Sequence, residues 1–122
     1  MKILVVGTGV MGFNHVRVLN DLKQVSKVVV VDESEQALAR VREKNFEKTE
    51  LFSSLKQALA ENAGFDAAVV AVPTRLHYEV ASELLEKEIP LLVEKPITDS
   101  VADGKKLLAK AEKKNVVLAV GH

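Results

Sequence analysis

Three glycines near the start of the chain have a spacing that suits the binding of phosphate groups. Gly7, Gly9 and Gly12 form a G-x-G-x-x-G motif between a short apolar run and an amphipathic stretch. In this setting the first glycine permits a tight turn, the second lets the backbone approach a pyrophosphate, and the third lets a helix pack close to a strand. The helix start offers free N–H groups to the phosphates. The motif therefore predicts a dinucleotide-binding loop, which also contains Thr8, Val10 and Met11.

An acidic residue follows at the position that such a site requires. Asp32 ends the run "KVVVVD", twenty positions after Gly12. An acid there can bind the adenosine ribose hydroxyls and would repel a 2′-phosphate. The next residues, Glu33 and Ser34, supply no arginine to reverse that preference. The pattern therefore favours NAD over NADP. A second class of protein also fits it, because methyltransferases that bind S-adenosylmethionine combine a glycine loop with a strand-end acid.

Polar residues also follow two later apolar runs. The run Ala67–Val72 is followed by "PTRLHYEVA", and the run Leu91–Val93 by "EKPIT". In open α/β sheets, ligands bind outside the carboxyl ends of the strands. We therefore expect one group of residues to share an edge with the glycine loop: Pro73, Thr74, His77, Glu94 and Lys95.

Two explanations of Glu94 and Lys95 remain open on physical grounds. A buried unpaired charge is costly, so a buried strand should not end on charges that have no partner. Either the strand opens into a cleft, where each charge finds a polar partner, or the two residues form a surface ion pair that is worth little. Lysine suits a cleft because a partly buried ammonium can lose its proton near neutral pH. A cis bond between Lys95 and Pro96 would aim the lysine, but most X-Pro bonds are trans, and the sequence does not decide between the two.

The elements that must position these residues alternate along the whole chain. Continuous apolar runs are typical of parallel strands that are covered on both faces. They occur at Ile3–Val6, Val28–Val31, Ala67–Val72, Leu91–Val93 and Val116–Val120, with a weaker one at Thr49–Phe52. Stretches with helical apolar spacing lie between them, at residues 10–23, 34–44, 75–87 and 99–114, and the expected N-caps are Ser34, Ser53 and Asp99. The alternation predicts an α/β Rossmann fold: a doubly wound parallel sheet of about six strands with helices on both faces.

Composition narrows the class of protein further. The 122 residues suit one domain, and 17 basic residues balance 17 acidic ones, so no net charge favours nucleic acid or a membrane surface. The chain has no cysteine, no visible signal peptide and no apolar run long enough to span a bilayer, so we expect a soluble, cytoplasmic protein. The three histidines lie far apart in sequence, so no metal site is expected, and His15 is interpreted as a packing or surface residue.

With these motifs in view, the whole chain resembles the NAD-binding domain of the oxidoreductase family of glucose–fructose oxidoreductase, inositol dehydrogenase and MocA. The family's motifs occur in its order: "GTGVMG", "AVPTRLHYEVA", "VEKPIT" and "VGH". Within that family the chain looks most like enzymes that oxidise the 3-hydroxyl of UDP-N-acetylglucosamine or its uronate. The resemblance makes a methyltransferase a remote alternative.

The resemblance implies a role for each matching residue. The three glycines match the pyrophosphate loop, and Asp32 matches the ribose acid. Glu94 matches a carboxylate near the nicotinamide ribose. Lys95 matches a lysine beside the substrate hydroxyl, which helps to position that hydroxyl or assists its deprotonation. Further residues match the lining of the cofactor cleft: Val72, Pro73, Thr74 and His77.

The resemblance also implies a second domain. In the family, an α+β domain supplies most of the substrate site, the acid–base residues and the homo-oligomer interface. This chain stops at Gly121-His122, where that domain would begin. We therefore expect residues 1–122 to bind NAD as the Rossmann domain of a longer dehydrogenase for sugar, cyclitol or nucleotide-sugar hydroxyls, and to be inactive alone. The alternative is a stand-alone NAD-binding sensor or regulatory module.

Overall fold

The computed structural model describes residues 1–121, which fold as alternating strands and helices. The strands are β1 (Lys2–Val6), β2 (Lys27–Val31), β3 (Thr49–Phe52), β4 (Ala67–Val70), β5 (Leu91–Glu94) and β6 (Leu118–Gly121). The α-helices are α1 (Val10–Asp21), α2 (Glu35–Glu43), α3 (Leu55–Glu61), α4 (His77–Glu86) and α5 (Val101–Lys114). A short 3₁₀ helix, η1 (Thr74–Leu76), leads into α4.

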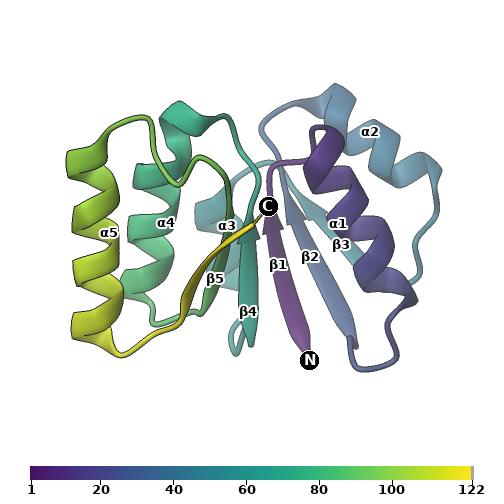
Figure 1. Ribbon diagram of the computed structural model, residues 1–122. Helices are drawn as coiled ribbons and strands as arrows, with labels where there is room; N and C mark the ends of the chain where they lie inside the picture. The colour runs from purple at the N-terminus through teal and green to yellow at the C-terminus, as the bar shows by residue number, and fades with distance from the viewer. Residues whose placement is uncertain (122) are drawn as a thin grey trace.

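The six strands form one parallel sheet in the order β3-β2-β1-β4-β5-β6 (Figure 1). Chain order runs in opposite directions on the two sides of β1, so the switch point lies between β1 and β4. In the strand register, Val6 is aligned with Val31 on β2 and with Val70 on β4. The loops that follow these strands therefore leave the sheet at one edge, where ligands bind in open α/β sheets. The predicted doubly wound Rossmann fold is confirmed.

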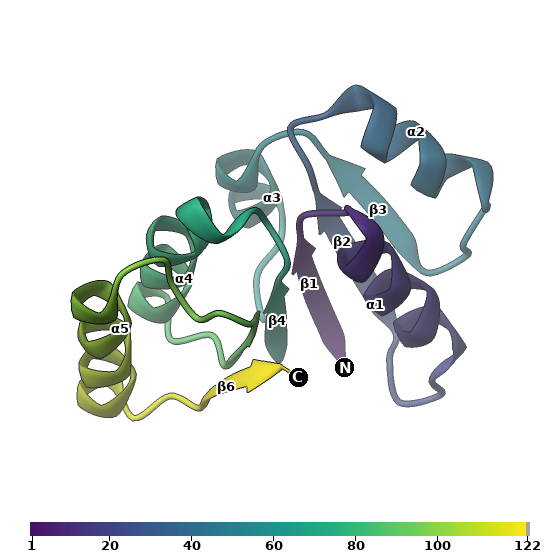
Figure 2. The same ribbon diagram turned by 45° about the horizontal axis from the view of Figure 1, so that its top comes forward.

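Helices cover both faces of the sheet, with α1 and α2 on one side and α3, α4 and α5 on the other (Figures 1 and 2). Side chains of β1 alternate between the two layers. Ile3 and Val5 join a core cluster with Val16 of α1 and Leu38 of α2. Leu4 and Val6 join a second cluster, which contains Leu84 of α4 and Leu107 of α5. The continuous apolar runs of β1, β2 and β4 are thus buried from both sides, as predicted, whereas the runs at β3 and β6 are partly exposed at the edges of the sheet.

Several element boundaries differ from the sequence prediction by one or two residues, and one helix was not predicted. The strand expected to reach Val72 ends at Val70, because β1 offers pairing partners only as far as Val6. The last strand, expected at Val116–Val120, is Leu118–Gly121, in register with β5. Helix α3 lies in a segment where no amphipathic stretch was identified.

Of the three expected N-caps, only Ser34 is correct. Its side chain accepts a hydrogen bond from the N–H of Ala37. The predictions at Ser53 and Asp99 are wrong by one residue, because Ser54 and Ser100 accept the capping bonds instead. In both places two capping residue types are adjacent, so the path of the backbone decides which one lies at the helix start.

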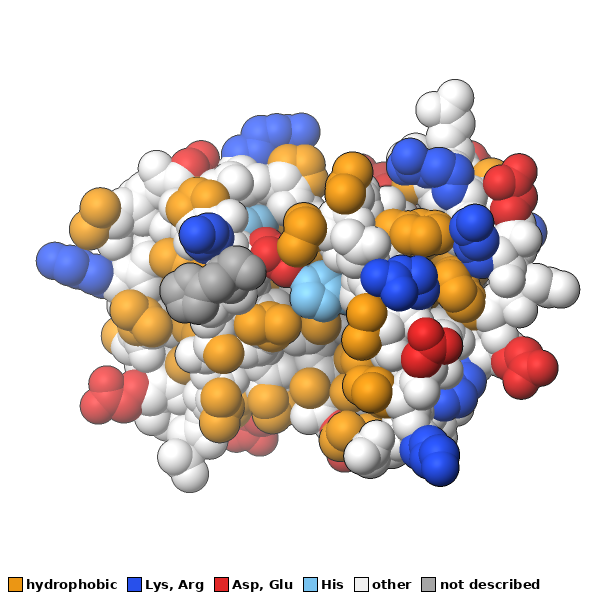
Figure 3. All heavy atoms as spheres, turned by 45° about the vertical axis from the view of Figure 1, so that its right-hand side comes forward, with side chains coloured by type: hydrophobic (Ala, Val, Ile, Leu, Met, Phe, Trp, Pro, Cys, Tyr) orange, Lys and Arg blue, Asp and Glu red, His pale blue; other side chains and the backbone are white. Residues whose placement is uncertain are grey.

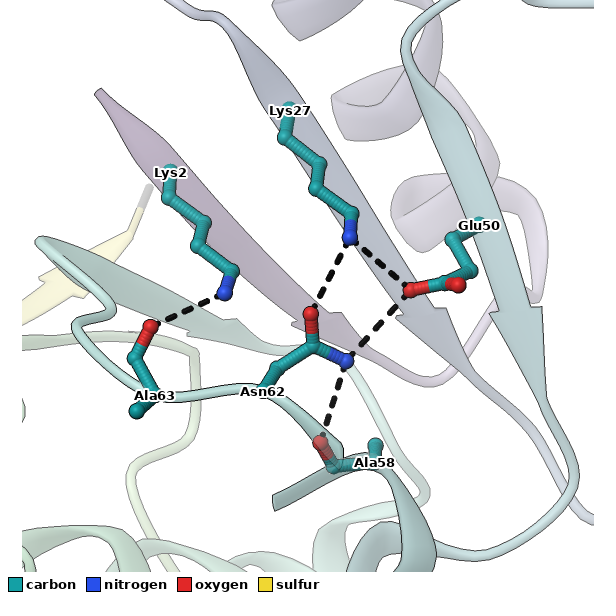
Figure 4. A network of polar contacts seen from close by, with 6 residues as sticks. All are labelled: Lys2, Lys27, Glu50, Ala58, Asn62 and Ala63. Carbon is teal, nitrogen blue, oxygen red and sulfur yellow. Dashed lines mark hydrogen bonds and ion pairs between the residues drawn. The ribbon is translucent and has the colours of Figure 1, made fainter. Parts of the chain in front are cut away.

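A polar network closes the amino edge of the sheet, opposite the edge with the switch-point loops (Figure 4). The buried amide of Asn62, just after α3, accepts a hydrogen bond from Lys27 Nζ at 3.1 Å. Its Nδ2 donates to the carbonyl of Ala58 at 3.2 Å and to Glu50 Oε1 at 3.4 Å. Lys27 Nζ also lies 3.0 Å from Glu50 Oε1. Asn62 therefore joins α3 to β2 and β3.

Replacement of Asn62 by leucine should lower the free energy of unfolding by about 1–3 kcal/mol, because the Ala58 carbonyl and Lys27 lose their partner. Replacement of Glu50 by glutamine should cost less than about 1 kcal/mol, because both ends of its ion pair are solvent-exposed. Urea unfolding of the two variants at neutral pH compares the costs. Equal effects would contradict the central place given to Asn62.

The same network predicts a small dependence of stability on pH. The hydrogen bond from Lys27 is the main cause that lowers the pKa of Glu50 below its usual value. A carboxyl group with a lower pKa in the folded state stabilises the fold above its unfolded pKa, and this stabilisation is lost as the pH falls through the folded pKa. Unfolding of the wild type between neutral pH and about pH 3 should show this loss, and Glu50→Gln should show less of it.

No helix in the described residues is long and apolar enough to cross a membrane. Basic and acidic side chains are interspersed on the face that Figure 3 turns forward, with hydrophobic ones between them. The absence of nucleic-acid and membrane partners and the cytoplasmic location stay predictions.

Candidate functional site

A cleft of about 770 Å³ opens at the carboxyl edge of the sheet, across the switch point. Its lining contains every predicted site residue except Gly12, which is buried beneath the loop. The β1–α1 loop and Asp32 at the end of β2 lie on one side of the switch point. The segment from Val72 to His77 follows β4, and Glu94 and Lys95 follow β5. The structure therefore brings together residues that are up to almost ninety positions apart in the chain.

The three glycines differ in what surrounds them. Gly7 has a φ of +97°, and a Cβ there would lie 2.6 Å from the carbonyl oxygen of Ala71. A Cβ on Gly12 would overlap the carbonyl oxygen of Gly7. These two positions need glycine so that the turn can form and α1 can approach the sheet.

Gly9 has open space instead. It is exposed, and a Cβ built there meets no atom within 4 Å. It is the N-cap of α1, and no side chain caps that helix. The N–H groups of the first turn are therefore left for a ligand. An anionic group such as a pyrophosphate fits this position, because Gly9 has no side chain that would separate the backbone from the cleft.

Asp32 holds the glycine loop as well as lining the cleft. Its Oδ2 accepts hydrogen bonds from the backbone N–H and the hydroxyl of Thr8, both at 2.8 Å. Its Oδ1 accepts a hydrogen bond from the N–H of Ser34 at 2.9 Å. The carboxylate thus fixes the β1–α1 loop to the end of β2, a role that the motif did not reveal.

Arg40 is a lining residue that the sequence analysis missed. It lies on α2 and lines the cleft together with Ala37, one helical turn earlier. The i, i+3 spacing of Ala37 and Arg40 on a helix that follows Asp32 was the available signal. Arg40 places a positive charge at the same end of the cleft as Asp32.

Glu94 has a partner that the sequence analysis did not foresee. Its Oε1 lies 2.5 Å from Nε2 of His15, on α1. The side chains of His15 and Glu94 are 25% and 15% exposed, so the pair is largely withdrawn from water. The interpretation of His15 as a packing or surface residue is therefore wrong. The two residues are 79 positions apart, and nothing local in the sequence joins them.

Glu94 and Lys95 do not form the ion pair that was considered as an alternative. Within residues 1–121, Glu94 pairs with His15, and no carboxylate pairs with Lys95. Lys95 is exposed at the cleft. The peptide bond between Lys95 and Pro96, which the sequence left undecided, is cis.

The side chain of His77 does not face solvent. It is 2% exposed, and both ring nitrogens lie near backbone carbonyl oxygens. Nδ1 lies 2.9 Å from the oxygen of Pro96 and 3.2 Å from that of Ile97. Nε2 lies 2.8 Å from the oxygen of Val72. His77 therefore ties the segment that follows β4 to the loop that carries Lys95.

Replacement of His77 by leucine should lower the free energy of unfolding by about 1–3 kcal/mol, because partly buried carbonyl groups lose their donor. His77→Gln keeps an N–H donor and should recover part of that loss. Urea unfolding measures both variants. A leucine variant as stable as the wild type would contradict the linking role of His77.

The sites of metal ions usually combine several imidazole, thiol or carboxylate groups. Within residues 1–121, no three such side chains gather in this way.

Comparison with known proteins agrees with this geometry. The model of an oxidoreductase family with an NAD-binding Rossmann fold, that of glucose–fructose oxidoreductase, inositol dehydrogenase and MocA, matches residues 1–122. Inositol 2-dehydrogenase 1 of Saccharopolyspora erythraea is 35% identical over 89% of this chain and 32% of its own length. UDP-N-acetylglucosamine 3-dehydrogenase of Acidithiobacillus ferrooxidans is 30% identical over the whole chain and 37% of its own length.

A solved structure extends the comparison to three dimensions. GenD2 from gentamicin A biosynthesis, crystallised in complex with NAD, has a TM-score of 0.89 and 31% identity. The match covers 99% of this chain and 34% of GenD2. This chain spans about a third of the length of the curated relatives it matches. The match to the family model over its whole length shows that the chain belongs to the oxidoreductase family of glucose–fructose oxidoreductase, inositol dehydrogenase and MocA, as its NAD-binding Rossmann domain.

Proposed function

We propose that this chain binds NAD(H) across the cleft and forms the cofactor-binding part of a dehydrogenase. The substrate class is a sugar, cyclitol or nucleotide sugar with an oxidisable hydroxyl group. The observation that carries the proposal is the placing of three features along one cleft: open space over Gly9, the carboxylate of Asp32 at one end, and Lys95 at the other. Relatives that act on inositol and on UDP-N-acetylglucosamine support the substrate class.

Each part of the cleft has a task in this proposal. The N–H groups at the start of α1 bind the pyrophosphate. Asp32 binds the adenosine ribose, and Glu94 lies toward the nicotinamide ribose. The nicotinamide supplies the hydride acceptor when the cofactor is bound. Lys95, exposed at the cleft, positions the substrate hydroxyl so that its carbon faces the acceptor.

Lys95 also favours a dehydrogenase over a sensor. A sensor that only binds NAD would use Gly9 and Asp32 but would have no need of a lysine beside the nicotinamide end. We further propose that residues 1–122 bind cofactor without turning over a substrate, and that a second domain completes the substrate site. The greater length of the relatives supports this proposal. Exposed apolar side chains at the edge of the sheet also support it: Val117 lies just before β6, and Val120 lies on β6.

Calorimetric titration of the chain with NAD⁺ and NADP⁺ tests the cofactor. The carboxylate of Asp32 should repel the 2′-phosphate more strongly than Arg40 attracts it, because Asp32 lies directly at the end of β2. We expect NAD⁺ to bind at least about tenfold more tightly than NADP⁺, a difference of about 1.4 kcal/mol. Tighter binding of NADP⁺ would mean that Arg40 dominates. Absence of binding of either would contradict the proposed function, and turnover by this chain alone would contradict the need for a second domain.

A further inference from the structure

The His15–Glu94 pair adjoins the cleft, which Glu94 lines, and the proposed function assigns the pair no reaction step. It joins α1, whose start forms the pyrophosphate loop, to the end of β5, which leads into Lys95. Gly121 of β6 lies beside the carboxylate, since a Cβ built on that glycine would be 3.5 Å from Glu94 Oε2. The carboxylate is therefore enclosed by α1 on one side and β6 on the other, and only the remaining side faces the cleft.

The place of the pair in the fold decides which half of a dinucleotide it meets. Asp32 ends β2 and Glu94 ends β5, on opposite sides of the switch point between β1 and β4. If the adenosine ribose binds at Asp32 and the pyrophosphate over Gly9, the other half of the molecule extends toward β5. The nicotinamide is thus the part of the cofactor that shares a region of the cleft with Glu94. This step rests on the proposed function.

The two redox forms of the nicotinamide differ in charge, and so do the two protonation states of the pair. The oxidised ring carries one positive charge, whereas the reduced ring is neutral. With a proton on His15, the His15–Glu94 pair is neutral overall, and without that proton it carries one negative charge. Histidine is the side chain whose charge commonly changes near neutral pH. In a site that is largely withdrawn from water, such a change alters the binding of a nearby charge several-fold.

We propose that His15 and Glu94 act together as a proton-linked element that sets which redox form of the nicotinamide cofactor the cleft prefers. Loss of the proton leaves a negative charge that favours NAD⁺, and uptake of the proton favours NADH. His15 is thus a positioning and selectivity residue that acts through Glu94. It does not touch the reacting atoms.

Other charged groups line the cleft and also influence the binding of the cofactor. The ionisable residues along its lining, apart from Glu94, are Asp32, Glu33, Arg40, Arg75, His77 and Lys95. In the described part of the chain, none of them forms an ion pair or hydrogen bond with His15 or Glu94 through its side chain. Asp32, Glu33 and Arg40 lie on the adenosine side, so their effects on the two redox forms cancel in the ratio of the two dissociation constants. Lys95 is next to Glu94 in the chain, and the ring of His77 contacts the loop that carries Lys95. Both residues stay constant in the variants below.

The test is the ratio of the dissociation constants of NAD⁺ and NADH at pH 6, 7 and 8. NADH binding is followed by its fluorescence and NAD⁺ binding by calorimetry. ADP, which lacks the nicotinamide half, is titrated at each pH as a reference for the adenosine half. We expect the NAD⁺/NADH ratio of the wild type to fall by about three- to tenfold from pH 6 to pH 8. The affinity for ADP should change much less.

Variants at three positions show which side chains cause the pH dependence of the ratio. His15→Gln keeps an N–H donor toward Glu94 but cannot take up a proton, so its ratio should not change with pH. Glu94→Gln keeps His15 but removes the negative charge, so it should weaken the preference for NAD⁺ at pH 8. Arg17→Gln is the matched control, because Arg17 is an exposed cation on the same helix and outside the cleft. Arg17→Gln should show the same dependence of the ratio on pH as the wild type.

Two results would overturn the inference while leaving the proposed function intact. One is a wild-type ratio that stays constant from pH 6 to pH 8 although both redox forms bind. The other is a His15→Gln variant that retains the wild-type dependence. Failure of the wild type to bind either redox form would instead contradict the proposed function, and the inference would fall with it.

Discussion

Replacement of Gly9 by alanine should remove most NAD(H) binding while the fold remains intact. The added methyl group meets no protein atom within 4 Å, and the backbone at Gly9 has a φ of −67°, which suits any residue. The free energy of unfolding should therefore change by less than about 1 kcal/mol. The methyl group would occupy the space through which a pyrophosphate reaches the helix start. We expect affinity to fall at least about tenfold in a calorimetric titration.

Replacement of Gly12 by alanine is the matched control, because it should destabilise the fold itself. Its methyl group would overlap the carbonyl oxygen of Gly7, so α1 would have to move away from the sheet. We expect the free energy of unfolding to fall by about 3 kcal/mol or more. Urea unfolding beside the titration separates the two outcomes. A Gly9→Ala protein that binds NAD(H) as well as the wild type would contradict the assignment of the loop.

Replacement of Asp32 by alanine should weaken NAD⁺ binding by about ten- to a hundredfold, the range expected when hydrogen bonds to a charged group are lost. NADP⁺ should lose less affinity, because the repulsion of its 2′-phosphate disappears while Arg40 remains in the cleft. The preference for NAD⁺ should therefore shrink. The free energy of unfolding should also fall by about 1–3 kcal/mol, because Thr8 and Ser34 lose their acceptor.

Two further variants separate these effects of Asp32. Thr8→Val removes a hydroxyl that donates to Asp32 but leaves the carboxylate, so stability should fall while the ratio of NAD⁺ to NADP⁺ affinity stays unchanged. Asp32→Ala combined with Arg40→Ala should lose the relative gain of NADP⁺. An Asp32→Ala protein that keeps the full preference for NAD⁺ would show that the carboxylate does not select the cofactor.

The fold could be predicted because its signals are local and repeated. Apolar runs such as Val28–Val31 and helical spacing such as that of α5 are each set by a few neighbouring residues, and their alternation fixes the class of sheet. Boundaries were less predictable. The end of β4 depends on how far β1 extends beside it, and the choice between Asp99 and Ser100 as a cap depends on the backbone path.

The sequence predicted which residues line the site better than it predicted the contacts between them. Motifs named the residues that line the cleft, because the carboxyl ends of parallel strands meet at one edge. The pairing of His15 with Glu94 joins residues from α1 and β5, and the contact of His77 with the Pro96 carbonyl joins α4 to a loop. Arg40 lies on a third element, α2. Such contacts depend on how helices pack on the sheet, which no single stretch of sequence encodes.

Amide chemical shifts of the chain, followed by NMR during titration with NADH, test the central claim most directly. The account predicts the largest changes at Gly9, Val10 and Met11 at the start of α1, with further changes at Asp32 and Glu94. The amides around Asn62, at the opposite edge of the sheet, should stay unchanged. Changes confined to other parts of the surface, or no changes at saturating NADH, would contradict the claim that this cleft binds the dinucleotide.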